Sequence, residues 1–205
     1  MLGGGFDKLN PFTLKGVEPP GLEGLLFDTL LSRSLDEPAT AYGLLARDVT
    51  VAADGRSAEF ELHPDARFHN GDPVLALDVK HSFDKLSGKE SAPQYRMYFS
   101  GIAGVTILGD RKLRFDFRDV NRELPLIAGS LPVFSHRWGN GKPLDQLITE
   151  VPIGSGPYVV AHVEAPRALV YKRNPMWWKH RRHASNWRAK RCKRRCGNVG
   201  CNAML

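Results

Sequence analysis

The sequence Ala-Arg-Phe-His-Asn-Gly-Asp-Pro-Val at Ala66–Val74 decides how the chain is organised. Its centre, His69–Pro73, combines Asn, Gly, Asp and Pro, which are the residues that favour tight turns, so we expect a turn there. After it, apolar residues recur at i, i+4 and i+7 and predict a helix over residues 77–86. These residues are Val79, Phe83 and Leu86.

Alternating apolar residues predict strands on both sides of this stretch. Ser57–Leu62 alternates and follows Asp54-Gly55, a pair typical of hairpin turns, and residues 49–51 alternate before that turn. Leu113–Phe117 alternates in the same way, after Gly109-Asp110. We therefore expect short antiparallel strands around the helix.

Leucines and glycines mark the remaining elements. The leucines after Pro19-Pro20 have the i, i+3, i+4, i+8 spacing of one face of a short helix; they are Leu22, Leu25, Leu26 and Leu30. Leu124–Phe134 predicts a buried connector or a short helix. Gly154–Pro157 predicts a tight turn into a strand at Tyr158–Val160, and Ala168–Lys172 predicts one more strand. The pattern indicates a mixed α+β fold without an internal repeat.

Composition excludes several classes of protein. The 205 residues are 42% hydrophobic and 25% charged, which is typical of a globular chain. No uncharged run approaches the length of about eighteen residues that a membrane helix needs, so we expect no integral membrane segment. The net charge is +7, but Lys179–Leu205 holds nine Lys and Arg residues and no Asp or Glu, which leaves 20 basic and 22 acidic residues in 1–178. The body therefore lacks the basic surface that phosphate binding requires.

The basic tail, Lys179–Leu205, also holds all three cysteines and has no apolar periodicity, so we expect it to be disordered. One explanation is a frameshift near codon 178, where the composition changes abruptly. Another is an arm that binds nucleic acid. The His and Cys spacings of the tail fit no standard zinc finger, so we expect no metal site.

The sequence contains no complete catalytic motif. Gly139–Lys142 resembles the end of a phosphate loop, but the first glycine and the final Ser or Thr are missing. Gly154-Ser155-Gly156 lacks the spacing of a nucleophile elbow. His63 and His69 flank Asp65, and we expect them to be surface histidines rather than metal ligands. The sequence predicts neither an enzyme nor a bound cofactor.

Several blocks occur in the order in which they appear in a known family. They are Phe6–Phe12 (FDKLNPF), Leu26–Leu31 (LFDTLL), Ala66–Val74, Arg122–Ile127 (RELPLI), Gly154–Tyr158 (GSGPY) and Lys172–Trp178. Together they resemble the extracellular solute-binding proteins of family 5, the peptide, dipeptide and nickel receptors of bacterial ABC importers, and within it the oligopeptide and microcin-C branch. The resemblance covers about residues 5–178. The chain departs from the family in having Leu75 where a helix-capping Thr is usual, and in ending far earlier.

The resemblance implies a fold and a set of site residues. We expect part of a class II periplasmic-binding-protein-like α/β fold that contains a first lobe and an accessory lobe and lacks the second lobe. Residues 1–24 and 150–178 would belong to the ligand-contacting first lobe, and residues 25–149 to the accessory lobe. Asn10 and Gly154-Ser155-Gly156 would lie near the ligand cleft, although the glycines are equally compatible with simple turns.

The resemblance implies binding rather than catalysis. We expect a monomeric peptide- or oligopeptide-binding component of an importer, located in the periplasm by resemblance although no signal peptide is visible in Met1–Gly5, with a permease in the inner membrane as its partner. Two alternatives stay open. The chain is a non-functional frameshift or pseudogene product, or it is a nucleic-acid-binding protein with a basic tail.

Overall fold

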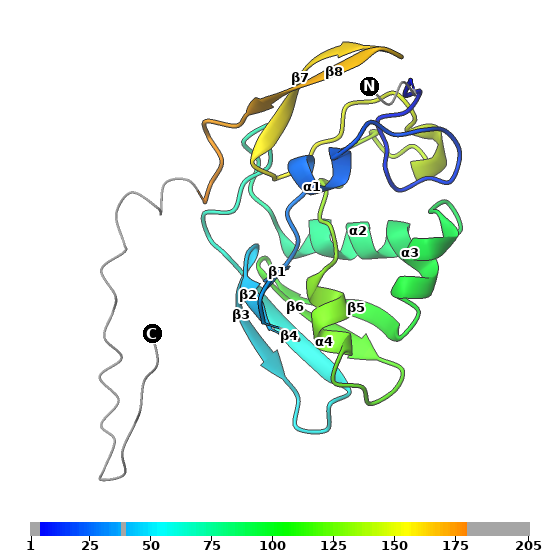
Figure 1. The fold of residues 1–205 in the computed structure, drawn as a ribbon. Coiled ribbons are helices and arrows are strands. Elements are labelled where there is room, and N and C mark those ends of the chain that lie inside the picture. The colour runs from blue at the N-terminus through cyan, green and yellow to red at the C-terminus, as the bar shows by residue number, and fades with distance from the viewer. Residues whose placement is uncertain (1–4, 38–39, 180–205) are drawn as a thin grey trace.

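A four-stranded antiparallel sheet forms one half of the structure, a computed structural model that describes residues 5–37 and 40–179 (Figure 1). The strands are β3 (Ala46–Val51), β4 (Ser57–Leu62), β5 (Ile102–Gly109) and β6 (Lys112–Phe117), in the order β3-β4-β6-β5. The hairpin expected from the sequence, β3–β4, is confirmed, and β6 also pairs with β5, a strand that the sequence pattern does not predict.

The two faces of this sheet differ in chemistry. On one face, Phe60 of β4 and Phe115 of β6 are fully buried, and the ring of Phe83 packs edge-on against Phe115 at 6.0 Å. On the other face, Glu59 pairs with Lys112 across the strands. Hydrophobic-in, polar-out alternation thus orients the sheet, as the sequence pattern predicts.

Helices cover the buried face. The predicted helix is α2 (Ala76–Ser87), and its residues Val79, Phe83 and Leu86 are buried as expected. It is followed by α3 (Pro93–Tyr98), and α4 (Leu124–Gly129) lies beside the small β1 (Leu31–Arg33) and β2 (Ala41–Gly43) hairpin. The apolar segment after residue 124 is thus a short helix followed by a buried connector.

The other half of the molecule is smaller and lies above α2 in Figure 1. It contains α1 (Leu22–Leu26), a 3-10 turn at Leu144–Gln146, and the hairpin of β7 (Tyr158–Glu164) and β8 (Ala168–Arg173). One continuous cluster of buried side chains joins the two halves, because Phe12 and Trp178 belong to the same core as Phe60 and Phe115. The mixed α/β fold expected from the sequence is confirmed.

The helix predicted over Leu22–Leu30 is wrong in length. It stops at Leu26, and Phe27 is extended with φ −118° and ψ 127°. The backbone N–H of Gly156 donates to the carbonyl of Leu26 at 2.9 Å, which satisfies a helix-end acceptor from outside the helix. Leu30 is fully buried as well, but it lies just before β1 and not on a helical face.

Candidate functional site

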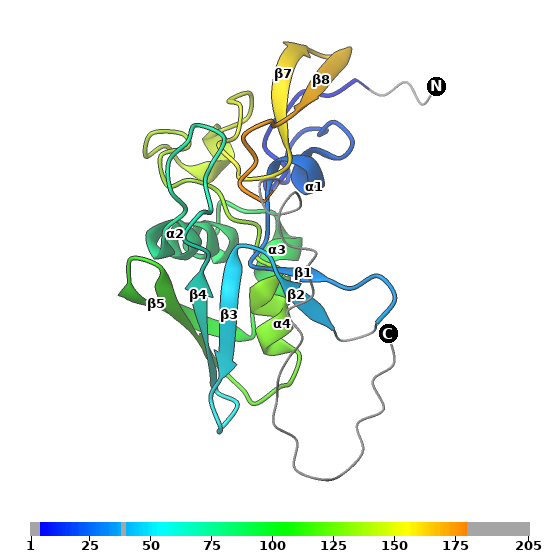
Figure 2. The same cartoon turned by 90° about the vertical axis from the view of Figure 1, so that its left-hand side faces the viewer.

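The N-terminal loop and the segment around the β7–β8 hairpin lie side by side (Figures 1 and 2). The backbone N–H of Phe6 donates to the carbonyl of Pro166 at 3.1 Å, and the hydroxyl of Tyr171 donates to the carbonyl of Pro20 at 3.3 Å. Strand β7 also packs against α1. The structure therefore brings together two segments that are about 150 residues apart in the sequence.

Asn10 lies in the N-terminal loop, and its side chain is fully buried. Its Nδ2 donates to the carbonyl of Leu144 at 2.8 Å, and its Oδ1 accepts from the backbone N–H of Phe12 at 3.0 Å. Both ends of the amide thus hold the loop against the 3-10 turn. A contact between Asn10 and a ligand stays a prediction.

Gly154 and Gly156 lie against the C-terminal end of α1. A Cβ on Gly154 would collide with the carbonyl oxygen of Leu26, and one on Gly156 would lie 2.5 Å from that of Leu25. The expected tight turn is only a bend at Gly156-Pro157. Neither glycine has a positive φ, so close backbone approach, rather than turn geometry, requires glycine here.

His69 also contacts the Gly154–Gly156 segment, through its backbone and its side chain. Its backbone N–H donates to the carbonyl of Gly154 at 2.8 Å, and its Nε2 lies 3.1 Å from the carbonyl of Gly156. Burial lowers the pKa of His69, and the bond to Gly156 opposes that shift in part. The neutral imidazole can donate from Nε2, so this interaction does not need a charged ring. The turn at His69–Pro73 is thereby joined to the predicted site.

Ser155 lies between the two glycines and is completely buried. Its Oγ has no hydrogen-bond partner among the described residues. A buried hydroxyl without a partner costs about 1–3 kcal/mol, and such groups call for a specific explanation. Of the four residues predicted to lie near a cleft, Ser155 is therefore the one whose side-chain polar atom has no hydrogen-bond partner among the described residues.

Asp28 is a buried polar residue that sequence reasoning missed. It follows α1, is 4% exposed, and its Oδ2 accepts hydrogen bonds from the indole Nε1 atoms of Trp177 and Trp178, each at 3.1 Å. Burial raises the pKa of Asp28 to about 6, against the lowering effect of the two indoles. The signal available in the sequence was an acidic residue within the apolar LFDTLL block.

The expectation that His63 is a surface histidine is wrong. It is 5% exposed, and its ring packs on the indole of Trp178 with 5.2 Å between centroids. The basic tail from residue 180 lies outside the described residues.

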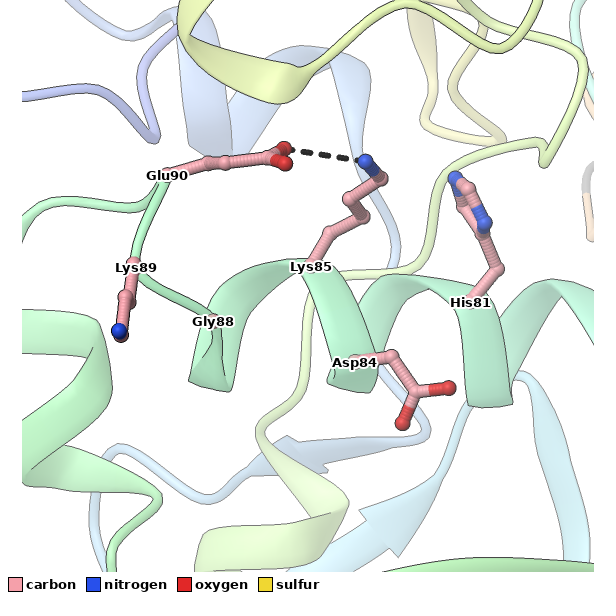
Figure 3. A pocket seen from close by; sticks show the side chains of 6 residues that line it. All are labelled: His81, Asp84, Lys85, Gly88, Lys89 and Glu90. Carbon is pink, nitrogen blue, oxygen red and sulfur yellow. Dashed lines mark hydrogen bonds and ion pairs between the residues drawn. The ribbon is translucent and has the colours of Figure 1, made fainter.

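A separate cavity of about 270 Å³ lies beside the C-terminal half of α2 (Figure 3). The side chains of His81, Lys85 and Glu90 lie on one side of the helix there, whereas Asp84 points to the other side. Lys85 Nζ donates to Glu90 Oε2 at 3.0 Å, and the same oxygen accepts the N–H of Leu144 at 2.6 Å. Because Lys85 and Glu90 pair with each other, we assign no ligand to this cavity.

Within residues 5–37 and 40–179, no helix is long and apolar enough to cross a membrane. No group of three or more His, Cys, Asp and Glu side chains within them is arranged to hold a metal ion.

Comparison with known sequences identifies relatives of the chain. The sequence profile of the bacterial extracellular solute-binding proteins, family 5 Middle, matches residues 40–189, so the match ends beyond Trp178. A putative binding protein from Brucella melitensis is 42% identical over 185 residues, which cover 85% of this chain and 30% of the relative. A probable peptide-binding protein, YejA, from Agrobacterium fabrum is 37% identical over 183 residues, with 85% and 29% coverage. The chain thus spans about 30% of the length of these relatives.

Solved structures share the fold. A dipeptide-binding protein from Pseudoalteromonas in complex with Met-Leu aligns with a TM-score of 0.70 at 20% identity, and the alignment covers 86% of this chain and 39% of that protein. NikA from Brucella suis in complex with Fe(III)-EDTA aligns with a TM-score of 0.70 at 21% identity, with 83% and 34% coverage. At these identities the similarity establishes the periplasmic-binding-protein architecture.

Proposed function

The chain belongs to the bacterial extracellular solute-binding proteins of family 5, and from this premise we propose that it forms the N-terminal part of a receptor that binds peptides or oligopeptides for an ABC importer. The observation that carries the proposal is the family match over residues 40–189. The names of the relatives support peptides as the ligand class, because one of them is a probable peptide-binding protein. The proposed role is binding, in keeping with the binding proteins that the family and its structural neighbours contain.

The two proposed lobes correspond to the two halves of the structure except at Leu144–Gln146, a 3-10 turn of the smaller half that falls within the accessory range. Residues 5–24 and 150–178 form part of the ligand-contacting lobe, and residues 25–149 form the accessory lobe packed on it. The hydrogen bond between Phe6 and Pro166 and the packing of β7 on α1 support the first assignment. The sheet and helices of the second half support the other, because they enclose most of the buried side chains.

The proposed cleft wall lies on the Gly154–Gly156 segment and the N-terminal loop. In this proposal Asn10 holds the wall in position, because its side-chain amide forms hydrogen bonds within the fold. Gly154 and Gly156 allow the backbone to approach α1 closely, and the hydroxyl of Ser155 is the polar atom that could serve a ligand after a small rearrangement. Backbone groups can form hydrogen bonds with the main chain of any peptide, whatever its side chains, which suits a receptor of broad specificity.

A complete cleft requires more chain than is present. Ligand sites bury most of the ligand surface, and two-lobed receptors close both lobes around it. The chain spans about 30% of the length of its relatives, so the opposite wall would come from the remaining part. The proposed cellular setting is the bacterial periplasm, with a monomeric receptor delivering its ligand to an inner-membrane permease.

A chimera tests the proposed function directly. Residues 5–178 would replace the matching segment of the probable peptide-binding protein from Agrobacterium fabrum, and a mixture of di- to pentapeptides would be titrated into it by calorimetry. The unmodified relative is the positive control. We expect peptide binding within about tenfold of that control, which is a difference of about 1.4 kcal/mol. A chimera that melts cooperatively but binds none of the peptides bound by the relative would contradict the proposal.

A further inference from the structure

The carboxylate of Asp28 connects two parts of the chain that are 149 and 150 residues apart in sequence. It lies between α1 and β1, and both of its indole donors lie in the short segment that follows β8. The two hydrogen bonds end on the same oxygen, Oδ2, at 3.1 Å each. Asp28 is thus the common acceptor for adjacent tryptophans.

The segment Asn174–Trp178 is held at both of its ends. At its start, the backbone N–H of Asn174 donates to the carbonyl of Pro157 at 2.8 Å, immediately before β7. At its end, the indole of Trp178 lies between Asp28 and the ring of His63, and Trp178 is 6% exposed. Releasing the indoles from Asp28 would therefore free the end of this segment while its start stays attached to the β7–β8 hairpin.

Protonation of Asp28 is compatible with both hydrogen bonds. A neutral carboxylic acid keeps one oxygen as an acceptor, so Oδ2 can receive the two indole N–H groups while Oδ1 carries the proton. Burial disfavours the charged form, because the carboxylate loses its hydration. The neutral acid is therefore the form that fits the closed, buried arrangement at lower cost.

We propose that Asp28 is a protonation-dependent anchor that holds the Asn174–Trp178 segment more tightly when its carboxyl group is neutral. The direction follows from linkage. A carboxyl group whose pKa is higher when buried than when exposed favours the buried state at low pH, and this advantage is lost as the pH rises through the higher value. For Asp28 the window lies between its ordinary value of 3.8 and about 6. The ratio of released to anchored segment should rise about tenfold per pH unit within that window.

Other charged groups near the anchor must be separated from Asp28. Lys179 acts on the carboxyl group electrostatically and favours its charged form. His63 packs on Trp178, and Asp65 Oδ2 lies 3.8 Å from His63 Nδ1, so a second pair of ionisable side chains lies close to the same indole. The test therefore needs a variant of His63 as well as one of Asp28.

Nuclear magnetic resonance of the indole N–H groups between pH 4 and 8 tests the anchor in the full chain. We expect the Nε1–H signals of Trp177 and Trp178 to move together with a shared midpoint near pH 6. Asp28→Asn should flatten both titrations, whereas His63→Gln should leave the midpoint unchanged. The Nε1–H of Trp138, which has no hydrogen-bond partner among the described residues, is an internal reference.

Two outcomes would overturn the proposal. One is a pair of indole signals that do not titrate in the unmodified chain. The other is a titration that persists in Asp28→Asn and disappears in His63→Gln. If Asp28→Asn fails to fold, the side-chain carboxyl carbon of Asp28 can be followed in the unmodified protein, where a midpoint below pH 4.5 would exclude the anchor. None of these readouts requires a peptide ligand, so the result is independent of the proposed function.

Discussion

At Gly154 the fold leaves no room for a side chain, because the backbone lies directly against the carbonyl oxygen of Leu26. We predict that Gly154→Ala lowers the free energy of unfolding by about 3 kcal/mol or more, since a backbone contact cannot move aside as a flexible side chain would. Urea denaturation followed by circular dichroism measures the change. Gly24→Ala is the matched control. Gly24 is exposed within α1 and a Cβ there meets nothing, so this variant should gain up to about 1 kcal/mol. Equal effects in the two variants would show that the close approach does not exist.

Ser155 gives a second prediction, based on its unpartnered hydroxyl. Ser155→Ala should raise the free energy of unfolding of the isolated chain by about 1 kcal/mol, because a buried polar group without a partner is removed. Ser91→Ala is the control, since Ser91 Oγ is also buried but donates to the carbonyl of Leu86 at 2.6 Å. That variant should lose about 1 kcal/mol. Destabilisation of similar size in both variants would mean that Ser155 has a hydrogen-bond partner in solution.

At the scale of single elements, the start of α2 carries the departure from the family noted in the sequence. Leu75 occupies the N-cap with φ −117° and ψ 164°, and it provides no side-chain cap, although its own N–H donates to Asp78 Oδ2 at 2.9 Å. A Thr at this position could cap the first turn. We predict that Leu75→Thr is more stable than Leu75→Val by about 1 kcal/mol, as measured by thermal denaturation. The two side chains have the same shape, so equal stability would exclude a capping defect.

Local periodicity was enough to predict some of these elements and not others. The strands β4 and β6 and the helix α2 were predictable because their apolar residues repeat with the period of the element. Strand β5 was missed because bulges between Ile102 and Gly104 and between Ile107 and Gly109 interrupt its alternation. Helix α3 has no buried residue, so it shows no apolar face in the sequence. Helix α1 was predicted too long because a distant glycine segment ends it.

The candidate site was less predictable than the fold, for a physical reason. Asn10 and Gly154–Gly156 were singled out through a family resemblance, while the structure supplies the contacts that explain the glycines and the orphaned hydroxyl. The interaction of Asp28 with Trp177 and Trp178 depends on tertiary contacts across about 150 residues. No spacing rule applies at that distance, so such a cluster becomes visible only in three dimensions.

At the scale of the whole molecule, a single hydrophobic core joins two halves that differ in how well their side chains are buried. The accessory half has a four-stranded sheet covered by α2, whereas the other half has a two-stranded hairpin in which most side chains are exposed or only partly buried. Val170 on β8 remains 48% exposed. This asymmetry agrees with a chain that spans about 30% of the length of its relatives. In the proposed receptor, the remaining part covers the hairpin and supplies the opposite wall of the cleft.

Calorimetric titration of the chain alone with the di- to pentapeptide mixture tests this account most directly. Because one wall of the proposed cleft is missing, we predict no sub-micromolar binding by the chain alone, whereas the chimera with the relative from Agrobacterium fabrum binds under the same conditions. Sub-micromolar affinity for the isolated chain, at a stoichiometry near one, would contradict the account, because it would show that this segment contains a complete binding site.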